Sequence, residues 1–210
     1  MAGAPASGRN SSRMTSQRLA DRPAIVDAVA NWALWRDTGR WDQLASLYTP
    51  DAIQHTTWFV GPAAEFIRLA RSRPPGGNLS QHFVGACAVE LAGDRAIAET
   101  RLILLVRGTL QRVAIDITCY CRSYDRFVRL DNAWRIARRE MIYEKDRIDP
   151  LTPGERPELD EHDLARYPAG YRHLAYFQAA GGAHITPDLP TPGSEALARL
   201  YAEGEKWLRG

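Results

Sequence analysis

Val113-Ala114-Ile115-Asp116-Ile117-Thr118-Cys119-Tyr120-Cys121-Arg122 is the stretch that decides the fold class of this chain. Val, Ile and Cys side chains occupy every second position, and the positions between them are mixed in polarity. A period of two is typical of a strand that buries one face and leaves the other partly open. We therefore predict a sheet with one apolar face in this part of the chain.

Further strands flank this stretch and are separated by short turn signals. The predicted turns are Gly93-Asp94, Gly108 and Asp131-Asn132. Links this short favour neighbouring antiparallel strands, which predicts a meander. The predicted strands are Ser80–Leu91, Arg95–Val106, Gln111–Leu130 and Ala133–Glu140.

Helical patterns dominate the sequence upstream of these strands. Asp21 offers an N-cap, and apolar residues recur at helical spacing from Ile25 to Arg36. Helices followed by strands indicate an α+β fold and not a βαβ repeat. The remaining elements expected here are helices at Trp41–Tyr48 and Ala63–Arg71, a strand at Ile53–Val60 and a loop at Arg73–Asn78.

The two ends of the chain differ from its middle. Residues 1–20 are rich in Ser, Ala, Gly and Arg, and we expect a disordered leader. Residues 21–148 form the predicted domain. Residues 149–210 carry two expected helices, Tyr171–Ala180 and Ser194–Leu208, in an arm too small for its own core. The arm is therefore expected to pack on the domain or on a neighbouring subunit.

Composition excludes several classes of partner. The net charge is +2 and the basic residues are spread out, so no nucleic-acid partner is expected. No run of about 18 apolar residues predicts a membrane span, and no secretory signal is recognisable, so the cytoplasm is the expected location. Neither the cysteines nor the arm histidines have the spacing of a metal site. These residues are Cys87, Cys119, Cys121, His162, His173 and His184.

His82 is the residue that points most directly to chemistry. It lies at the start of the strand Ser80–Leu91, and its ordinary pKa of about 6.5 suits a base near neutral pH. Asp37 follows the first helix and is the candidate acid that would orient it. The alternatives are a histidine that bonds to a neighbour at a strand end and an aspartate that makes a turn with Thr38-Gly39.

Three motifs resemble the SnoaL-like family of the nuclear-transport-factor-2-like superfamily. Trp32-Ala33-x-x-x-Asp37-x-x-x-Trp41-Asp42-x-Leu44 is similar to the first-helix motif of scytalone dehydratase. Gln81-His82-Phe83-Val84-Gly85 is similar to that enzyme's histidine strand, and hexachlorocyclohexane dehydrochlorinase has the same pair of positions. Asp131-Asn132-Ala133-Trp134-Arg135-Ile136 resembles the family's final hairpin. The resemblance covers roughly residues 20–146.

This resemblance implies both a fold and a catalytic pair. The implied fold is a cone-shaped α+β barrel, with three N-terminal helices on a curved antiparallel sheet. The implied dyad is Asp37 and His82, and the implied assembly is a homo-oligomer, either a trimer or a dimer. Leu102 stands near the position of a second family histidine, and Arg36 stands at the position of a motif tyrosine. A scytalone-like substrate is therefore not implied.

We predict from these residues a cofactor-independent lyase or isomerase of the dehydratase type. His82 would abstract a proton from a small, largely apolar cyclic substrate, and the sequence has no metal or cofactor motif. Two alternatives share the fold: a non-catalytic ligand-binding or assembly module, and the structural small subunit of a ring-hydroxylating dioxygenase.

Six further residues are candidates for binding the substrate. Each also has a structural interpretation, as a surface histidine, a core tryptophan, an amphipathic sheet tyrosine or an exposed charge on the sheet. The candidates are His55, Trp58, Tyr120, Tyr143, Arg101 and Asp116.

Overall fold

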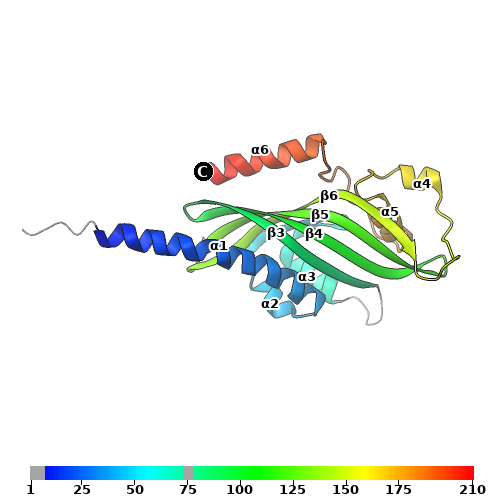
Figure 1. Ribbon diagram of the computed structural model, residues 1–210, viewed down its shortest axis with the longest axis horizontal. Coiled ribbons are helices and arrows are strands. Elements are labelled where there is room, and N and C mark those ends of the chain that lie inside the picture. Colours follow the sequence, from blue (N-terminus) through cyan, green and yellow to red (C-terminus); the bar gives the residue numbers. More distant parts are fainter. Residues whose placement is uncertain (1–7, 73–77) are drawn as a thin grey trace, which may run out of the picture.

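A computed structural model describes residues 8–72 and 78–210 of the chain. Three helices and a short β-hairpin precede four long strands, and three further helices follow these strands (Figure 1). The elements are α1 (Gly8–Asp37), α2 (Trp41–Ala45), β1 (Tyr48–Thr56), β2 (Phe59–Pro62), α3 (Ala63–Arg71), β3 (Leu79–Ala92), β4 (Arg95–Leu110), β5 (Val113–Leu130), β6 (Ala133–Pro150), α4 (Glu161–Ala165), α5 (Arg172–Ala180) and α6 (Glu195–Arg209).

The six strands form one sheet in the order β2-β1-β6-β5-β4-β3. The meander β3 to β6 is antiparallel, as predicted, and the α+β fold class is confirmed. The sheet differs from the prediction at β1, which runs parallel to β6. The single strand expected at Ile53–Val60 is a hairpin, because the chain turns at Thr57-Trp58 and pairs β1 with β2.

Two strands extend beyond their predicted ends for identifiable reasons. Gly108 does not form the expected turn, and β4 continues through it to Leu110. A Cβ at Gly108 would lie 2.5 Å from the Phe177 ring, so the close approach of α5 accounts for the glycine. The turn lies instead at Gln111-Arg112, where both residues have positive φ. β6 also continues ten residues past Glu140 to Pro150, since its second half pairs with β5.

The first helix also differs from its prediction. α1 begins at Gly8, well before the expected N-cap at Asp21. The Asp21 carboxylate instead accepts hydrogen bonds from Trp134 Nε1 at 3.1 Å and from Arg129 Nη2 at 2.6 Å. Residues of high helix propensity are frequent before Asp21, which favours an earlier start. Residues 1–7 of the predicted leader and 73–77 of the predicted loop lie outside the described residues.

The sheet has an inner face, covered by α1, α2 and α3, and an outer face. Ala96 and Ala98 of β4 pack into the inner core with Trp32 of α1, whereas Ile97 between them packs outward against α6. Figure 1 shows α6 on the opposite side of the sheet from α2 and α3. Strand alternation therefore decides which side chains reach the inner face.

The arm packs on both faces of the chain's own sheet. α5 extends the inner layer, where Leu174 and Phe177 join an apolar cluster with β4, β5 and β6. α6 covers part of the outer face through Leu197 and Leu200, beside Tyr124. The irregular segment between β6 and α5 contains the short α4, which was not predicted.

Candidate active site

Asp37 and His82 meet at the inner face of the sheet. His82 Nδ1 lies 2.7 Å from Asp37 Oδ1, and the His82 backbone N–H donates to Asp37 Oδ2 at 2.6 Å. Asp37 ends α1 and His82 lies near the start of β3, so the fold joins residues that are 45 positions apart. A carboxylate only accepts, which assigns the ring proton to Nδ1 and leaves the Nε2 lone pair free of this interaction.

The surroundings of this pair favour a neutral imidazole. Burial lowers the pKa of His82 below its ordinary value of 6.5, although the hydrogen bond that Asp37 accepts from the ring opposes the shift. The Trp32 indole and the imidazole are nearly perpendicular, at 83°, with ring centroids 5.2 Å apart. Arg36 lies beside the pair, with Nη1 4.0 Å from Asp37 Oδ1 and 3.2 Å from Ser80 Oγ. His82 can therefore accept a proton over most of the neutral range.

His82 opens onto a cavity of about 820 Å³. This volume suits a small organic ligand. The wall combines apolar side chains from the sheet and helices with a few uncharged polar groups, and Arg36 is its only residue with a permanent charge among those described. The lining residues are Trp32, Arg36, Gln54, Thr56, Thr57, Trp58, Phe66, Asn78, Ser80, His82, Leu102, Leu104, Val106, Thr109, Leu110, Gln111, Cys121, Met141, Tyr143, Phe177, Gln178, Ala180, Gly181 and Ala183.

A fully buried ion pair packs against Trp32, one of the residues of the cavity wall. Arg139 donates to both carboxylate oxygens of Asp125, at 2.6 and 2.7 Å, and Ser123 Oγ donates to the same carboxylate. The Arg139 guanidinium lies 4.0 Å from the centroid of the Trp32 ring. The pair therefore fixes the indole that contacts His82.

Two of the six predicted binding residues line the cavity. Trp58 packs against Phe66 at a centroid distance of 5.3 Å. Tyr143 Oη accepts the backbone N–H of Thr57 at 3.2 Å, and burial raises its pKa well above the ordinary value. Tyr143 is therefore a neutral hydroxyl at physiological pH.

The other four candidates do not line this cavity. His55 Nδ1 lies 3.2 Å from Glu140 Oε2, and the contacts from His55 and Arg138 outweigh burial and lower the pKa of Glu140 to about 2. Strand alternation turns the remaining three toward the outer face. Arg101 pairs with Glu144, Asp116 pairs with Arg107, and Tyr120 lies under the Lys145 ammonium.

Sequence reasoning missed the contribution of the arm to the cavity. Phe177, Gln178 and Ala180 of α5 line it, together with Gly181 and Ala183. His173 and Leu174 anchor the start of α5, because both bond to the buried carboxylate of Asp146. No motif marks these residues, and the sequence signals only that the arm must bury an apolar face.

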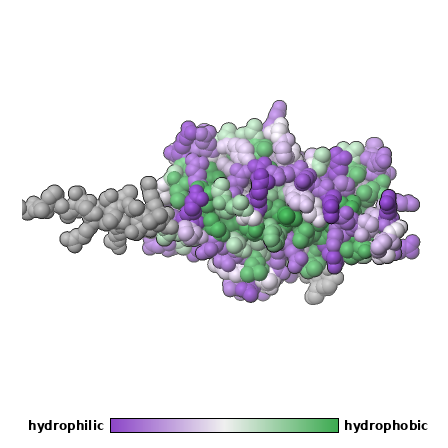
Figure 2. Space-filling view, viewed as in Figure 1, coloured by the Kyte–Doolittle hydropathy of each residue, from purple (hydrophilic) through white to green (hydrophobic). Residues whose placement is uncertain are grey.

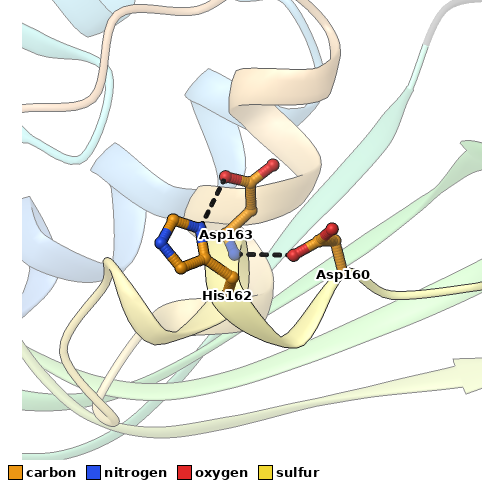
Figure 3. Close-up of side chains that lie close together, drawn as sticks. All are labelled: Asp160, His162 and Asp163. Atoms are coloured by element: carbon orange, nitrogen blue, oxygen red, sulfur yellow. Dashed lines mark hydrogen bonds and ion pairs between the residues drawn. The ribbon is translucent and has the colours of Figure 1, made fainter.

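Among the described residues, one group of three side chains has ligand atoms close enough together to hold a metal ion, and it contains no cysteine. Cys119 and Cys121 are buried free thiols, and Cys87 is half-buried. Figure 3 shows Asp160, His162 and Asp163 together at the start of α4, where Asp160 Oδ1 accepts the Asp163 N–H. All three side chains are exposed, so this cluster is an ordinary helix start.

Comparisons with known proteins agree with the resemblance in the motifs. A SnoaL-like domain model matches residues 17–140. The chain is 28% identical over 201 residues to a PEP2-like protein of Fusarium vanettenii, covering 90% of this chain and 86% of that protein. It is also 30% identical over 139 residues to a dehydratase of Pestalotiopsis microspora, covering 59% of this chain and 87% of that protein.

Solved structures show the same fold at lower identity. A protein assigned as a scytalone dehydratase from Novosphingobium aromaticivorans aligns with a TM-score of 0.55 at 18% identity, over 69% of this chain and 99% of its own. A hexachlorocyclohexane dehydrochlorinase from Novosphingobium barchaimii aligns at 0.53 and 19% identity, over 70% and 99%. No helix in residues 8–72 and 78–210 has the length and apolar character to cross a membrane. Because the SnoaL-like domain model matches more than half of its residues, this chain belongs to the SnoaL-like domain family.

Proposed function

We propose that this protein is a lyase or isomerase in which His82 removes a proton from carbon on a small, largely apolar cyclic substrate. The observation that carries the proposal is the Asp37–His82 hydrogen bond at the wall of a cavity of about 820 Å³. The dehydratase among the sequence relatives supports the same class of reaction.

The proposed reaction begins with the neutral imidazole. Nε2 accepts the proton as the C–H bond breaks, and the electron pair passes to an adjacent carbonyl as an enolate. The enolate electrons then form the C=C bond as the bond from the β-carbon to hydroxide or halide breaks. The His82 imidazolium gives its Nε2 proton to a leaving hydroxide, which departs as water, or to solvent when halide leaves as the anion. Return of the proton to another carbon completes an isomerisation. Asp37 stabilises the imidazolium that forms and keeps the ring oriented. This step uses side chains of the chain alone.

The buried apolar wall supports a substrate with little charge. Leu102, Leu104 and Met141 face the cavity, and Leu102 stands where the family resemblance places a second histidine. A carbonyl in this cavity would therefore need another hydrogen-bond donor. A ring ketone without charged groups is the simplest compound that tests the proposed base.

Deuterium exchange at the activated ring carbon of 2-tetralone provides this test. We expect exchange in D₂O, followed by NMR, to be faster with the protein than in buffer. His82→Gln should lower the protein-dependent rate by about 10²–10⁴-fold, the usual contribution of a positioned base. His162→Gln is a control, because His162 is exposed at the start of α4 and does not line the cavity.

Two results would contradict this proposal. Equal exchange rates for His82→Gln and the unmodified protein would remove His82 as the base. Tight binding of 2-tetralone without any acceleration would favour the ligand-binding alternative.

A further inference from the structure

Gln54 places a second polar group at the cavity wall. It belongs to β1, is fully buried and lines the cavity that His82 also lines. Its Oε1 accepts a hydrogen bond from Tyr48 Oη at 2.7 Å. Its Nε2 is buried and has no hydrogen-bond partner among the described residues. The donor half of this amide is therefore the part that lacks a partner.

The neighbouring hydrogen bonds fix which end of the amide is the donor. Trp32 Nε1 can only donate, and it lies 2.5 Å from Tyr48 Oη. Tyr48 accepts this bond and has a single proton, which it donates to Gln54. Burial also raises the pKa of Tyr48 to about 12, so the hydroxyl keeps its proton. The amide oxygen consequently faces Tyr48, and Nε2 retains both of its N–H groups.

A buried N–H without an acceptor is unfavourable and rare in folded proteins. We propose that Gln54 Nε2 donates a hydrogen bond to an oxygen atom of the molecule that occupies the cavity. The matching ligand group is a carbonyl or an enolate oxygen, because both are acceptors. Among the buried polar atoms without a partner in the described residues, Gln54 Nε2 is the only N–H group on a residue that lines the cavity, since Arg139 does not line it.

The indole of Trp32 connects this donor with His82. The indole packs against the imidazole, with ring centroids 5.2 Å apart, and its Nε1 begins the chain of bonds that orients Gln54. A ring ketone in the cavity can therefore meet a donor and the imidazole beside one shared indole. The donor would also stabilise an enolate formed by His82, and this last step alone rests on the proposed function.

The carbonyl stretching band of bound 2-tetralone, carbon-13 labelled at the carbonyl, tests the donor directly. A hydrogen bond lowers the frequency of this band. We expect a lower frequency in the protein than in a dry apolar solvent, and a return toward the solvent value in Gln54→Met. The dissociation constant should rise about three- to tenfold, which corresponds to one neutral hydrogen bond.

Matched variants keep this experiment decisive. Gln43→Met makes the same substitution at an exposed residue of α2 that does not line the cavity, and it should leave the band at its low frequency. Gln54→Asn keeps a buried amide but shortens it by one methylene, so it replaces Gln54→Met if that variant does not fold. An unchanged band in the folded Gln54 variant would overturn the proposal, as would a band at the apolar-solvent value in the unmodified protein.

The two proposals can fail independently. His82→Gln tests the base through deuterium exchange, and the bound carbonyl band in that variant should stay low. A lowered carbonyl frequency without any protein-dependent deuterium exchange would support the Gln54 donor and contradict the catalytic proposal. If exchange depends on His82 but the carbonyl frequency does not change in the Gln54 variants, the catalytic proposal is supported and the Gln54 donor is contradicted.

Discussion

Asp37 accepts two hydrogen bonds from His82, one from the ring at 2.7 Å and one from the backbone N–H at 2.6 Å. One carboxylate therefore holds both the imidazole and the main chain of β3. The same carboxylate joins the end of α1 to the start of β3. The orientation of His82 thus depends on a contact between two elements and not on its rotamer alone.

Asp37→Asn should greatly lower the rate of deuterium exchange, while the protein remains folded. The amide retains one acceptor for the His82 backbone N–H but loses the charge that stabilises an imidazolium. We expect the exchange rate of 2-tetralone to fall by about 10²–10⁴-fold, with a cooperative unfolding transition retained. NMR exchange rates and urea unfolding measure the two effects separately. Full activity in this variant would remove Asp37 from the mechanism.

The pH dependence of exchange should reflect the lowered pKa of His82. Burial lowers this pKa below 6.5, so the neutral base persists into mildly acid solution. The rate should rise with pH to a plateau, with its midpoint below 6.5. Asp37 raises the pKa, so Asp37→Asn should move the midpoint to lower pH. Rates corrected for hydroxide catalysis over about pH 4–8 test this, and a midpoint above the ordinary value would contradict it.

The same shift has a consequence for stability. The unfolded chain binds a proton at His82 more readily than the folded chain does. The contribution of this histidine is therefore complete above its ordinary pKa and is lost as the pH falls toward the folded pKa. Urea unfolding of the protein and of His82→Gln at several pH values should show a smaller acid destabilisation in the variant.

Arg139→Met should destabilise the protein severely. It leaves the fully buried Asp125 carboxylate with only the Ser123 hydroxyl as a side-chain donor among the described residues. Breaking one partner of a buried pair costs about 3–5 kcal/mol. The double variant Arg139→Met/Asp125→Leu should recover a large part of this loss in urea unfolding. A double variant less stable than the single variant would contradict this explanation.

Gly204→Ala should destabilise the protein, although alanine is usually favoured over glycine inside a helix. A Cβ there would overlap the Tyr124 hydroxyl, because α6 approaches β5 closely at this point. Alanine adds about 1 kcal/mol of helix propensity, but the overlap should outweigh it and give a net loss of about 1–3 kcal/mol. Urea unfolding of Gly204→Ala, with and without Tyr124→Phe, measures the contribution of the hydroxyl. A Gly204→Ala variant that is more stable than the unmodified protein would contradict this prediction, because α6 would then have shifted away from Tyr124.

We predict that the protein forms a homo-oligomer through the uncovered outer face of the sheet. Leu79, Phe83 and Leu105 share this face and are 58%, 68% and 37% exposed. Figure 2 shows hydrophobic residues interspersed with hydrophilic ones on the visible face of the molecule. Light scattering at micromolar concentration should give a mass above 23.5 kDa, and Phe83→Asp should lower it. A monomeric mass for the unmodified protein would contradict this prediction.

The sequence predicted the fold class because the strand alternation is long and regular. It did not predict a β-bulge in β6. Tyr120 pairs with Lys145 but Cys121 pairs with Tyr143, so Glu144 is left without a partner in the register. Glu144 and Lys145 therefore both face outward, whereas Tyr143 lines the cavity. Alternation alone cannot reveal such a bulge, since it depends on the partner strand.

The candidate site was predictable to the extent that local motifs marked it. His82 and Asp37 lie in motifs with a recognisable pattern, and the geometry places them within one hydrogen bond. Gln54 has no such pattern, because its role follows from Tyr48 and Trp32, which the fold brings beside it. A glutamine in a strand indicates no chemistry until its neighbours are known.

The wall that α5 adds places part of the cavity lining outside the segment of the chain that contains the proposed base. His82, Asp37 and Gln54 lie within the SnoaL-like match at 17–140, whereas Phe177 and Gln178 lie beyond it. A chimera that takes its α5 segment from a relative should thus change which compounds bind and keep the same proton-transfer apparatus. Such a division allows new substrates to arise by exchange of one peripheral helix.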